Sequence, residues 1–104
     1  MRRDHVLFVG ADDRVALLEP LLPAARFDVE RTDRYEAGLQ GLIARNPDVC
    51  LVAYHLDGWT ALDFLRESRR LGSNVPVIFL ARPCEVALDY ESMALWGADW
   101  LDVT

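Results

Sequence analysis

The sequence contains no lysine, only two cysteines and two histidines, and no apolar run near the roughly 20 residues that span a bilayer. The short apolar runs and the strand-like start of the chain argue against a membrane span or a leader, so we expect a cytoplasmic protein. Two cysteines do not make a disulfide framework. We expect Cys50 to be a small core residue and Cys84 to be a thiol in a loop, without a role.

Positive charge is scarce as well, because 11 basic residues face 17 acidic ones and leave a net charge of -6. A nucleic-acid backbone needs a basic face that displaces its counterions, so we expect no nucleic-acid partner and no membrane partner. The hydrophobic content of 52% excludes a disordered chain. With 104 residues, we expect one folded domain over residues 1–104.

Several motifs that would indicate an enzyme are missing. The sequence has no P-loop, no Gly-x-Gly-x-x-Gly fingerprint and no nucleophile elbow around a serine. His5 and His55 show no metal-ligand spacing with each other or with the cysteines. We therefore expect no enzymatic activity, no metal and no cofactor.

Short apolar runs alternate with helical patterns along the whole chain, which is typical of a parallel α/β sheet. We expect strands at residues 6–9, 27–31, 49–54, 75–80 and 100–103. Helices are expected at about 12–22, 34–45, 60–71 and 84–95. The predicted buried side chains of the second and third helices are Ala37, Leu39, Leu42 and Ile43, and Leu62, Phe64 and Leu65, respectively.

The third strand and the segments after it carry a resemblance to a known family. Pro47-Asp48 precedes four apolar residues, a loop follows at 54–58, and Val75-Pro76 opens another apolar run. Together with Gly97-Ala98-Asp99 near the end, this pattern resembles the receiver domain of bacterial response regulators. The resemblance covers essentially the whole chain. It implies a flavodoxin-like three-layer sandwich around a parallel five-stranded sheet of order 2-1-3-4-5.

The same resemblance implies a phosphorylation site at the carboxyl ends of the strands, and here the sequence departs from the family. Receiver chemistry needs two acids that hold Mg²⁺, an acceptor aspartate, a hydroxyl residue and a lysine. The corresponding positions are Gly10, Ala11, Ala53, Ala81 and Val103 (or Thr104, with a one-residue shift). An alanine methyl cannot attack a phosphoryl group, and a chain without lysine cannot be realigned to restore one. The resemblance therefore points to a degenerate receiver, or pseudo-receiver.

Nearby acids offer alternative sites. Asp12 and Asp13 could form the acidic pair in a shifted alignment, but we expect them to cap the first helix. Asp57 could act as a displaced acceptor, but we expect it to be a turn residue before Gly58. His55 and Gly58 match part of a cobalamin-binding pattern, and we expect a solvated loop there instead.

We expect this pseudo-receiver to act in bacterial two-component signal transduction as a phosphorylation-independent interaction or dimerisation module. The helix expected at 84–95 has more apolar residues than one packed face requires. A protein partner or a second copy (a homodimer) would dock on this helix and on the strand at 100–103. The candidate contact residues are Leu88, Leu95, Trp96, Trp100 and Trp59.

The resemblance implies a further helix after residues 100–103, which the 104 residues do not include. Three explanations fit: the sequence is a piece of a longer signalling protein, a second copy covers the face, or another protein does. We favour the first, with an output domain in the same polypeptide, as in cyclic-di-GMP enzymes, sensor kinases and transcription regulators. An alternative function is a small-molecule sensor that uses the crevice at the strand carboxyl ends.

Overall fold

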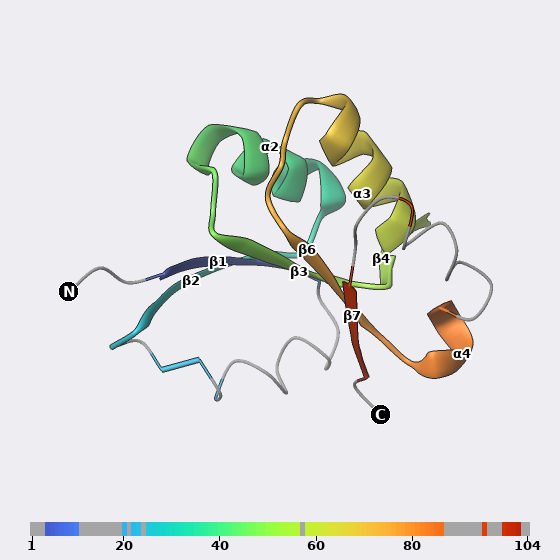
Figure 1. Cartoon of the computed structure of the whole chain (residues 1–104), viewed down its shortest axis with the longest axis horizontal. Coiled ribbons are helices and arrows are strands. Elements are labelled where there is room, and N and C mark those ends of the chain that lie inside the picture. The colour runs from blue at the N-terminus through green and yellow to red at the C-terminus, as the bar shows by residue number, and fades with distance from the viewer. Residues whose placement is uncertain are drawn as a thin grey trace.

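The computed structural model describes residues 4–10, 20, 22–23, 25–56, 58–86, 95 and 99–102. Most of the helix expected at 12–22, most of the helix expected at 84–95, and Asp57 therefore lie outside the described residues. The main sheet has five parallel strands: β1 (Asp4–Val9), β2 (Phe27–Thr32), β3 (Val49–Ala53), β6 (Val77–Ala81) and β7 (Asp99–Asp102). Their order is β2-β1-β3-β6-β7, which confirms the predicted arrangement (Figure 1).

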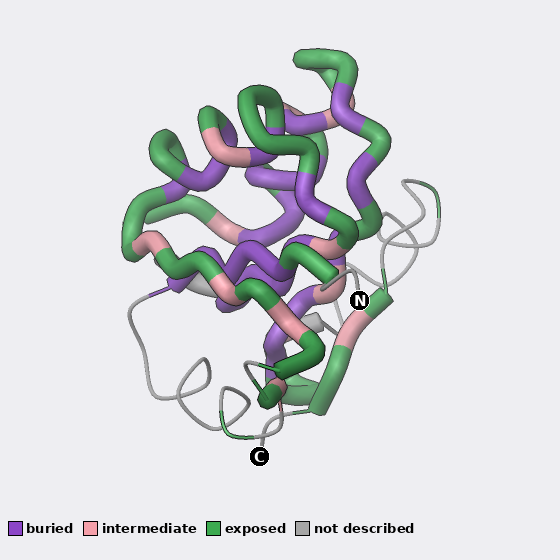
Figure 2. Tube along the Cα trace, turned by 90° about the vertical axis from the view of Figure 1, so that its left-hand side faces the viewer, coloured by how far each residue is buried: buried purple, intermediate pink, exposed green. Residues whose placement is uncertain are grey.

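The central strands are buried on both faces. On one face, Leu7, Cys50, Val52 and Phe79 belong to the core that packs under helices α2 (Tyr35–Arg45) and α3 (Ala61–Arg70). On the other face, Val6, Phe8, Leu51 and Leu80 form a second core cluster. The apolar runs are continuous because neither face of these strands meets water, and Figure 2 shows the buried trace through the centre of the molecule.

Helix α2 (Tyr35–Arg45) lies with α3 on one side of the sheet (Figure 1). Its buried residues are Tyr35, Gly38, Leu39 and Leu42, at the spacing i, i+3, i+4 and i+7 of one helix face. The prediction was right for Leu39 and Leu42 but wrong for Ala37 and Ile43, which are exposed. Both of these flank the true stripe, which begins with a tyrosine and a glycine that the hydrophobic pattern alone does not identify.

Helix α3 (Ala61–Arg70) buries the three predicted residues Leu62, Phe64 and Leu65. Its start is fixed by a capping box, because Thr60 Oγ1 accepts from Asp63 N (3.3 Å) and Asp63 Oδ2 accepts from Thr60 N (3.0 Å). Both helices are followed by a residue with a positive φ angle, as is common at helix C-termini. Asn46 (φ 47°) ends α2, and Gly72 (φ 92°) follows α3.

Arg69 differs from the other arginines of α3, which point to solvent. Its Nη1 donates to the carbonyl oxygens of Ser73 and Val75, each at 3.0 Å. These two bonds tie the end of α3 to the segment that leads into β6. A charged group that satisfies two loop carbonyls acts as part of the scaffold.

Two short elements were not predicted. Strands β4 (His55–Leu56) and β5 (Trp59–Thr60) pair antiparallel as a small hairpin, with Gly58 at φ 80° in its turn.

Helix α4 is described over Pro83–Val86, so Cys84 lies in its first turn and not in a loop as predicted. Within the described ranges, no helix is long and apolar enough to cross a membrane.

Gly38 is placed where a side chain would collide with the core. A Cβ there would lie 2.7 Å from Val9 Cγ2 and 3.1 Å from Phe64 Cε2. We expect Gly38→Ala to lower the free energy of unfolding by about 1–3 kcal/mol, because the overlap forces the helix away from β1. Urea denaturation measures this change.

Gly41→Ala is the matched control on the same helix. Its Cβ would lie 3.3 Å from Leu7 Cδ2, the end of a flexible side chain, and alanine favours the helix by up to about 1 kcal/mol. We expect the Gly41 variant to be at least as stable as the original chain. Equal losses for the two variants would contradict the close packing of α2 on β1.

Candidate functional site

The predicted site lies where the parallel strands end. The carboxyl ends of parallel strands share one edge of a sheet, which is where open α/β sheets commonly bind ligands. Ala53 ends β3 and Ala81 ends β6, in a register that pairs Ala53 with Leu80. Gly10 follows β1 one step beyond the Val9–Val52 pair. The structure thus brings Gly10, Ala53 and Ala81 together at this edge.

These three residues offer no nucleophile, no acid and no metal ligand. Ala53 and Ala81 are fully buried, at 0% exposure, and Gly10 is buried as well. Gly10 N donates to Thr32 O at 2.9 Å, so its backbone completes the pairing of β1 with β2. The other predicted positions, Ala11 and Val103 (or Thr104), lie outside the described residues, as do Asp12 and Asp13.

The full burial of the two alanines also bears on the sensor alternative. A ligand held in a crevice needs accessible atoms on the crevice wall. Neither Ala53 nor Ala81 presents any exposed surface. The geometry of these two positions therefore gives the small-molecule alternative no support.

Tyr35 also contributes to this edge of the sheet, and the sequence analysis did not identify it. This tyrosine begins α2, is 3% exposed, and its Oη lies 3.1 Å from Ala53 O and 3.4 Å from Tyr54 O. The hydroxyl therefore donates to the backbone at the end of β3, at the predicted acceptor position itself. The only signal in the sequence was an aromatic residue with a hydroxyl at the beginning of a helix that follows an edge strand.

Tyr35 belongs to an aromatic cluster that joins this edge to the surface. Its ring packs on Phe64 of α3 (centroids 5.4 Å apart) and edge-on against Trp59 of the hairpin (5.7 Å). Tyr54 packs edge-on against Phe79 at 6.1 Å. Such pairs contribute stability beyond their buried area. The cluster holds α2, α3, the hairpin and two strands in one arrangement.

Trp59, a predicted contact residue, is 37% exposed. It lines a shallow surface hollow of about 400 Å³ together with Gly58, Asp63, Arg66 and Glu67. The hydrogen bond from Arg70 to Glu67 (Nε to Oε2, 3.0 Å) holds the pKa of this carboxyl below its ordinary value. The ring of Trp59 thus contacts Tyr35 and is also partly exposed to solvent.

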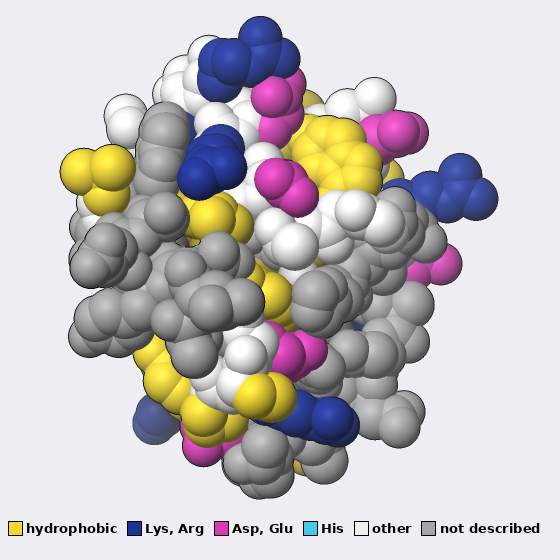
Figure 3. All heavy atoms as spheres, turned by 90° about the vertical axis from the view of Figure 1, so that its right-hand side faces the viewer, with side chains coloured by type: hydrophobic (Ala, Val, Ile, Leu, Met, Phe, Trp, Pro, Cys, Tyr) yellow, Lys and Arg dark blue, Asp and Glu magenta, His cyan; other side chains and the backbone are white. Residues whose placement is uncertain are grey.

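The other predicted contact residues are only partly described. Leu95 is 84% exposed, whereas Trp100 is half-buried and packs against the core under α2 and α3. Leu88 and Trp96 lie outside the described residues. Leu101, which was not predicted, is 43% exposed. Figure 3 shows the corresponding side of the molecule, where hydrophobic atoms reach the surface between charged side chains.

The cysteines divide as predicted between core and surface. Cys50 is completely buried, and its burial raises the pKa of the thiol far above the ordinary value, so it stays protonated. Cys84 is exposed. Among the residues that the structure describes, no group of three or more histidine, cysteine, aspartate or glutamate side chains could hold a metal ion.

Comparison with known proteins identifies the fold. No protein-family model matches the sequence, and no curated protein matches it. A candidate response regulator from Chloroflexus aurantiacus is similar in structure (TM-score 0.81, 24% identity, covering 97% of this chain and 85% of that one). The receiver domain of Francisella response regulator 1452 is similar too (TM-score 0.79, 19% identity, 96% and 84% covered).

Full-length FixJ from B. japonicum gives a TM-score of 0.82 at 23% identity, with 98% of this chain and 51% of FixJ covered. This chain thus corresponds to about half of that regulator. All of these identities are below 25%, so the likeness is one of fold. The chain has the fold of a response-regulator receiver domain, as the sequence pattern predicted.

The Tyr35 hydroxyl should stabilise the end of β3 measurably. We expect Tyr35→Phe to lower the free energy of unfolding by about 0.5–1.5 kcal/mol, because Ala53 O loses a buried donor. Tyr35→Ala should cost more, about 3–5 kcal/mol, because the ring contacts with Trp59 and Phe64 are lost as well. Urea denaturation of both variants separates the two contributions. An unchanged stability of the phenylalanine variant would refute the role of the hydroxyl.

Proposed function

We propose that this chain is a phosphorylation-independent pseudo-receiver that acts as a protein-interaction or dimerisation module in bacterial signal transduction. One observation carries the proposal: Gly10, Ala53 and Ala81 meet at the edge where receivers hold a metal-binding acid, the acceptor aspartate and a hydroxyl residue. A receiver-like domain that cannot be phosphorylated can still bind other proteins through its surface.

The interior of the same edge supports a fixed conformation. A working receiver has to change shape when it is phosphorylated, and that requires an element with two arrangements. Here the Tyr35 hydroxyl and the rings around it tie the end of β3 to both helices of one layer. We infer a module that presents one surface permanently.

The surface we assign to the partner, or to a second copy, includes α4 and β7. The β6–β7 register places Leu101 beside Leu80, so Leu101 extends the second core cluster to the solvent-exposed edge of the sheet. Leu95 adds another exposed apolar side chain to the segment between these elements. Exposed apolar side chains of this kind are candidates for contact with a partner.

The absence of acceptor chemistry can be tested directly. We expect no gain in intact mass when the chain is incubated with Mg²⁺ and acetyl phosphate, because no aspartate occupies the end of β3. Ala53→Asp should remain unmodified as well, since the chain has no lysine and Gly10 supplies no carboxylate. A stoichiometric phosphoryl group that hydroxylamine removes from the original chain would overturn the proposal.

The assigned surface can be tested by sedimentation velocity over a wide concentration range. We expect a concentration-dependent dimer, and we expect Leu95→Arg to weaken it by roughly tenfold or more, because a charge would have to be buried at the contact. Ile43→Arg is the matched control, since Ile43 is 50% exposed on α2. A monomer at every concentration would exclude self-association and leave a different protein as the partner.

A further inference from the structure

A groove runs between α2 and the outer strand β2, away from the surface proposed above. It consists of two adjoining cavities of about 260 Å³ and 420 Å³. Both are lined by Leu7, Glu30, Gly41 and Arg45, so they are two halves of one depression. The helix contributes small side chains to its wall, namely Ala37, Gly41 and Ala44.

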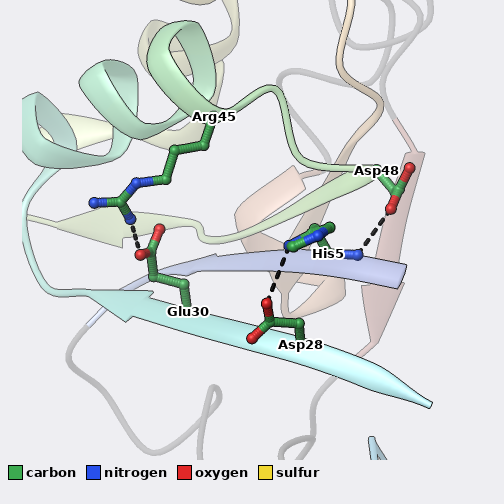
Figure 4. Close-up of polar contacts among 5 residues, drawn as sticks. All are labelled: His5, Asp28, Glu30, Arg45 and Asp48. Carbon is green, nitrogen blue, oxygen red and sulfur yellow. Dashed lines mark hydrogen bonds and ion pairs between the residues drawn. The ribbon is translucent and has the colours of Figure 1, made fainter. Parts of the chain in front are cut away.

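One ion pair crosses this groove, and a contact between two neighbouring strands lines it (Figure 4). Arg45 reaches from the end of α2 to Glu30 on β2 and separates the two halves. His5 Nδ1 lies 3.3 Å from Asp28 Oδ2, and His5 N donates to Asp48 Oδ2 at 2.8 Å. The side chains of both ion pairs are about half-exposed. Exposed pairs contribute little stability, so an incoming group can replace Arg45 or His5 at small cost.

Strand β2 also has an open backbone edge. Arg26 O and Thr32 O accept hydrogen bonds from Asp4 N and Gly10 N, so the even-numbered residues of β2 face β1. Successive residues of a strand turn their backbone groups to opposite sides, and Val29 therefore faces outward. In the part of the chain that the structure describes, β2 pairs with β1 alone, and neither the N–H nor the C=O of Val29 has a partner.

The side chains of β2 define what can pair there. Phe27 and Val29 pack against the second core cluster, on the sheet face opposite α2. Asp28 and Glu30 point to the α2 side, where they line the groove. A strand added to this edge would place alternate residues beside these two sets. Its residues on the α2 side should be basic, and the residues between them apolar.

A second copy of the chain does not satisfy this pattern. A two-fold axis perpendicular to the sheet pairs strand residues of the same parity across an antiparallel contact. Centred on Val29, such a contact places Asp28 opposite Glu30, and centred on Asp28, Glu30 or Arg31, it places a charged residue opposite itself. Centred on Phe27, it pairs β2 with the residues that precede the strand. Like charges directly opposite each other destabilise a pair of strands. The occupant is therefore a different sequence.

We infer that β2 binds an extended, basic–apolar alternating segment of a partner protein, which adds to the sheet as a sixth strand. The backbone of the segment pairs with Val29, and its lysine or arginine side chains lie in the groove beside Asp28 and Glu30. The small residues of α2 leave room for the aliphatic stems of these side chains. This is strand addition in a groove between a helix and an edge strand.

This inference does not depend on the proposed function of the α4–β7 surface. The two surfaces lie on opposite edges of the sheet, because β2 and β7 are its first and last strands. Either surface can fail its test while the other passes.

The probe is an acetylated, amidated Lys-Val-Lys-Val-Lys peptide, titrated into the ¹⁵N-labelled chain and followed by NMR. We expect saturable amide shifts at Val29 and along α2, and no binding of the matching Glu-Val-Glu-Val-Glu peptide. If the peptide lies antiparallel to β2, its valine N–H groups pair with Val29, and N-methylation of the two valines should abolish binding. If it lies parallel, its lysine N–H groups form these bonds, and N-methylation of the lysines should abolish binding. Binding that survives both modifications would reduce the contact to simple charge attraction and overturn strand addition.

Variants of the protein complete the test. Asp28→Lys with Glu30→Lys should weaken peptide binding by roughly tenfold or more, and the isosteric pair Asp28→Asn with Glu30→Gln by less. Glu36→Lys is the matched control, because Glu36 is exposed on α2 and lines neither cavity. Equal binding by all variants would overturn the inference. So would sedimentation data in which the Asp28 and Glu30 substitutions disrupt a dimer, because the occupant would then be a second copy.

Discussion

The structure depends on the burial of three neighbouring parallel strands, β1, β3 and β6, between two apolar layers. Their backbone groups are satisfied within the sheet, so their side chains can be apolar on both faces. Cys50, Val52 and Phe79 pack toward α2 and α3, while Phe8, Leu51 and Leu80 pack on the opposite side. This double burial places the three strands at the centre of the sheet, and their parallel direction brings their carboxyl ends to a single edge.

Polar contacts are distributed unevenly over the two ends of the sheet. Near the amino ends of β1 and β2, His5, Asp28 and Asp48 form ion-pair and hydrogen-bond contacts that are open to solvent. At the carboxyl edge, Ala53 and Ala81 are buried, and the hydroxyl of Tyr35 donates a hydrogen bond to Ala53 O. At Ala53 and Ala81, the edge that a receiver uses for chemistry is therefore as buried as the core of this domain.

The approximate strand positions could be predicted because burial on both faces requires continuous apolar runs, which are visible in the sequence. The order of the strands was implied by the resemblance to receiver domains. The buried face of α2 could be predicted only in part. Gly38 is buried because β1 approaches it closely, and no hydrophobicity pattern assigns a glycine to a core. The hairpin at Trp59 was missed because two residues per strand are too few to show an alternation. The structural role of Arg69 could not be predicted, because its partners are loop carbonyl groups whose positions the sequence does not reveal.

The enclosure of Ala53 has a consequence for how such a domain can change over evolutionary time. A single substitution of Ala53 by aspartate would put a carboxylate into a buried position, beside a carbonyl group that already accepts a hydrogen bond from the Tyr35 hydroxyl. Burial of an unpaired charge opposes folding. An acidic side chain at this position would therefore require further substitutions that open or polarise the packing around the end of β3.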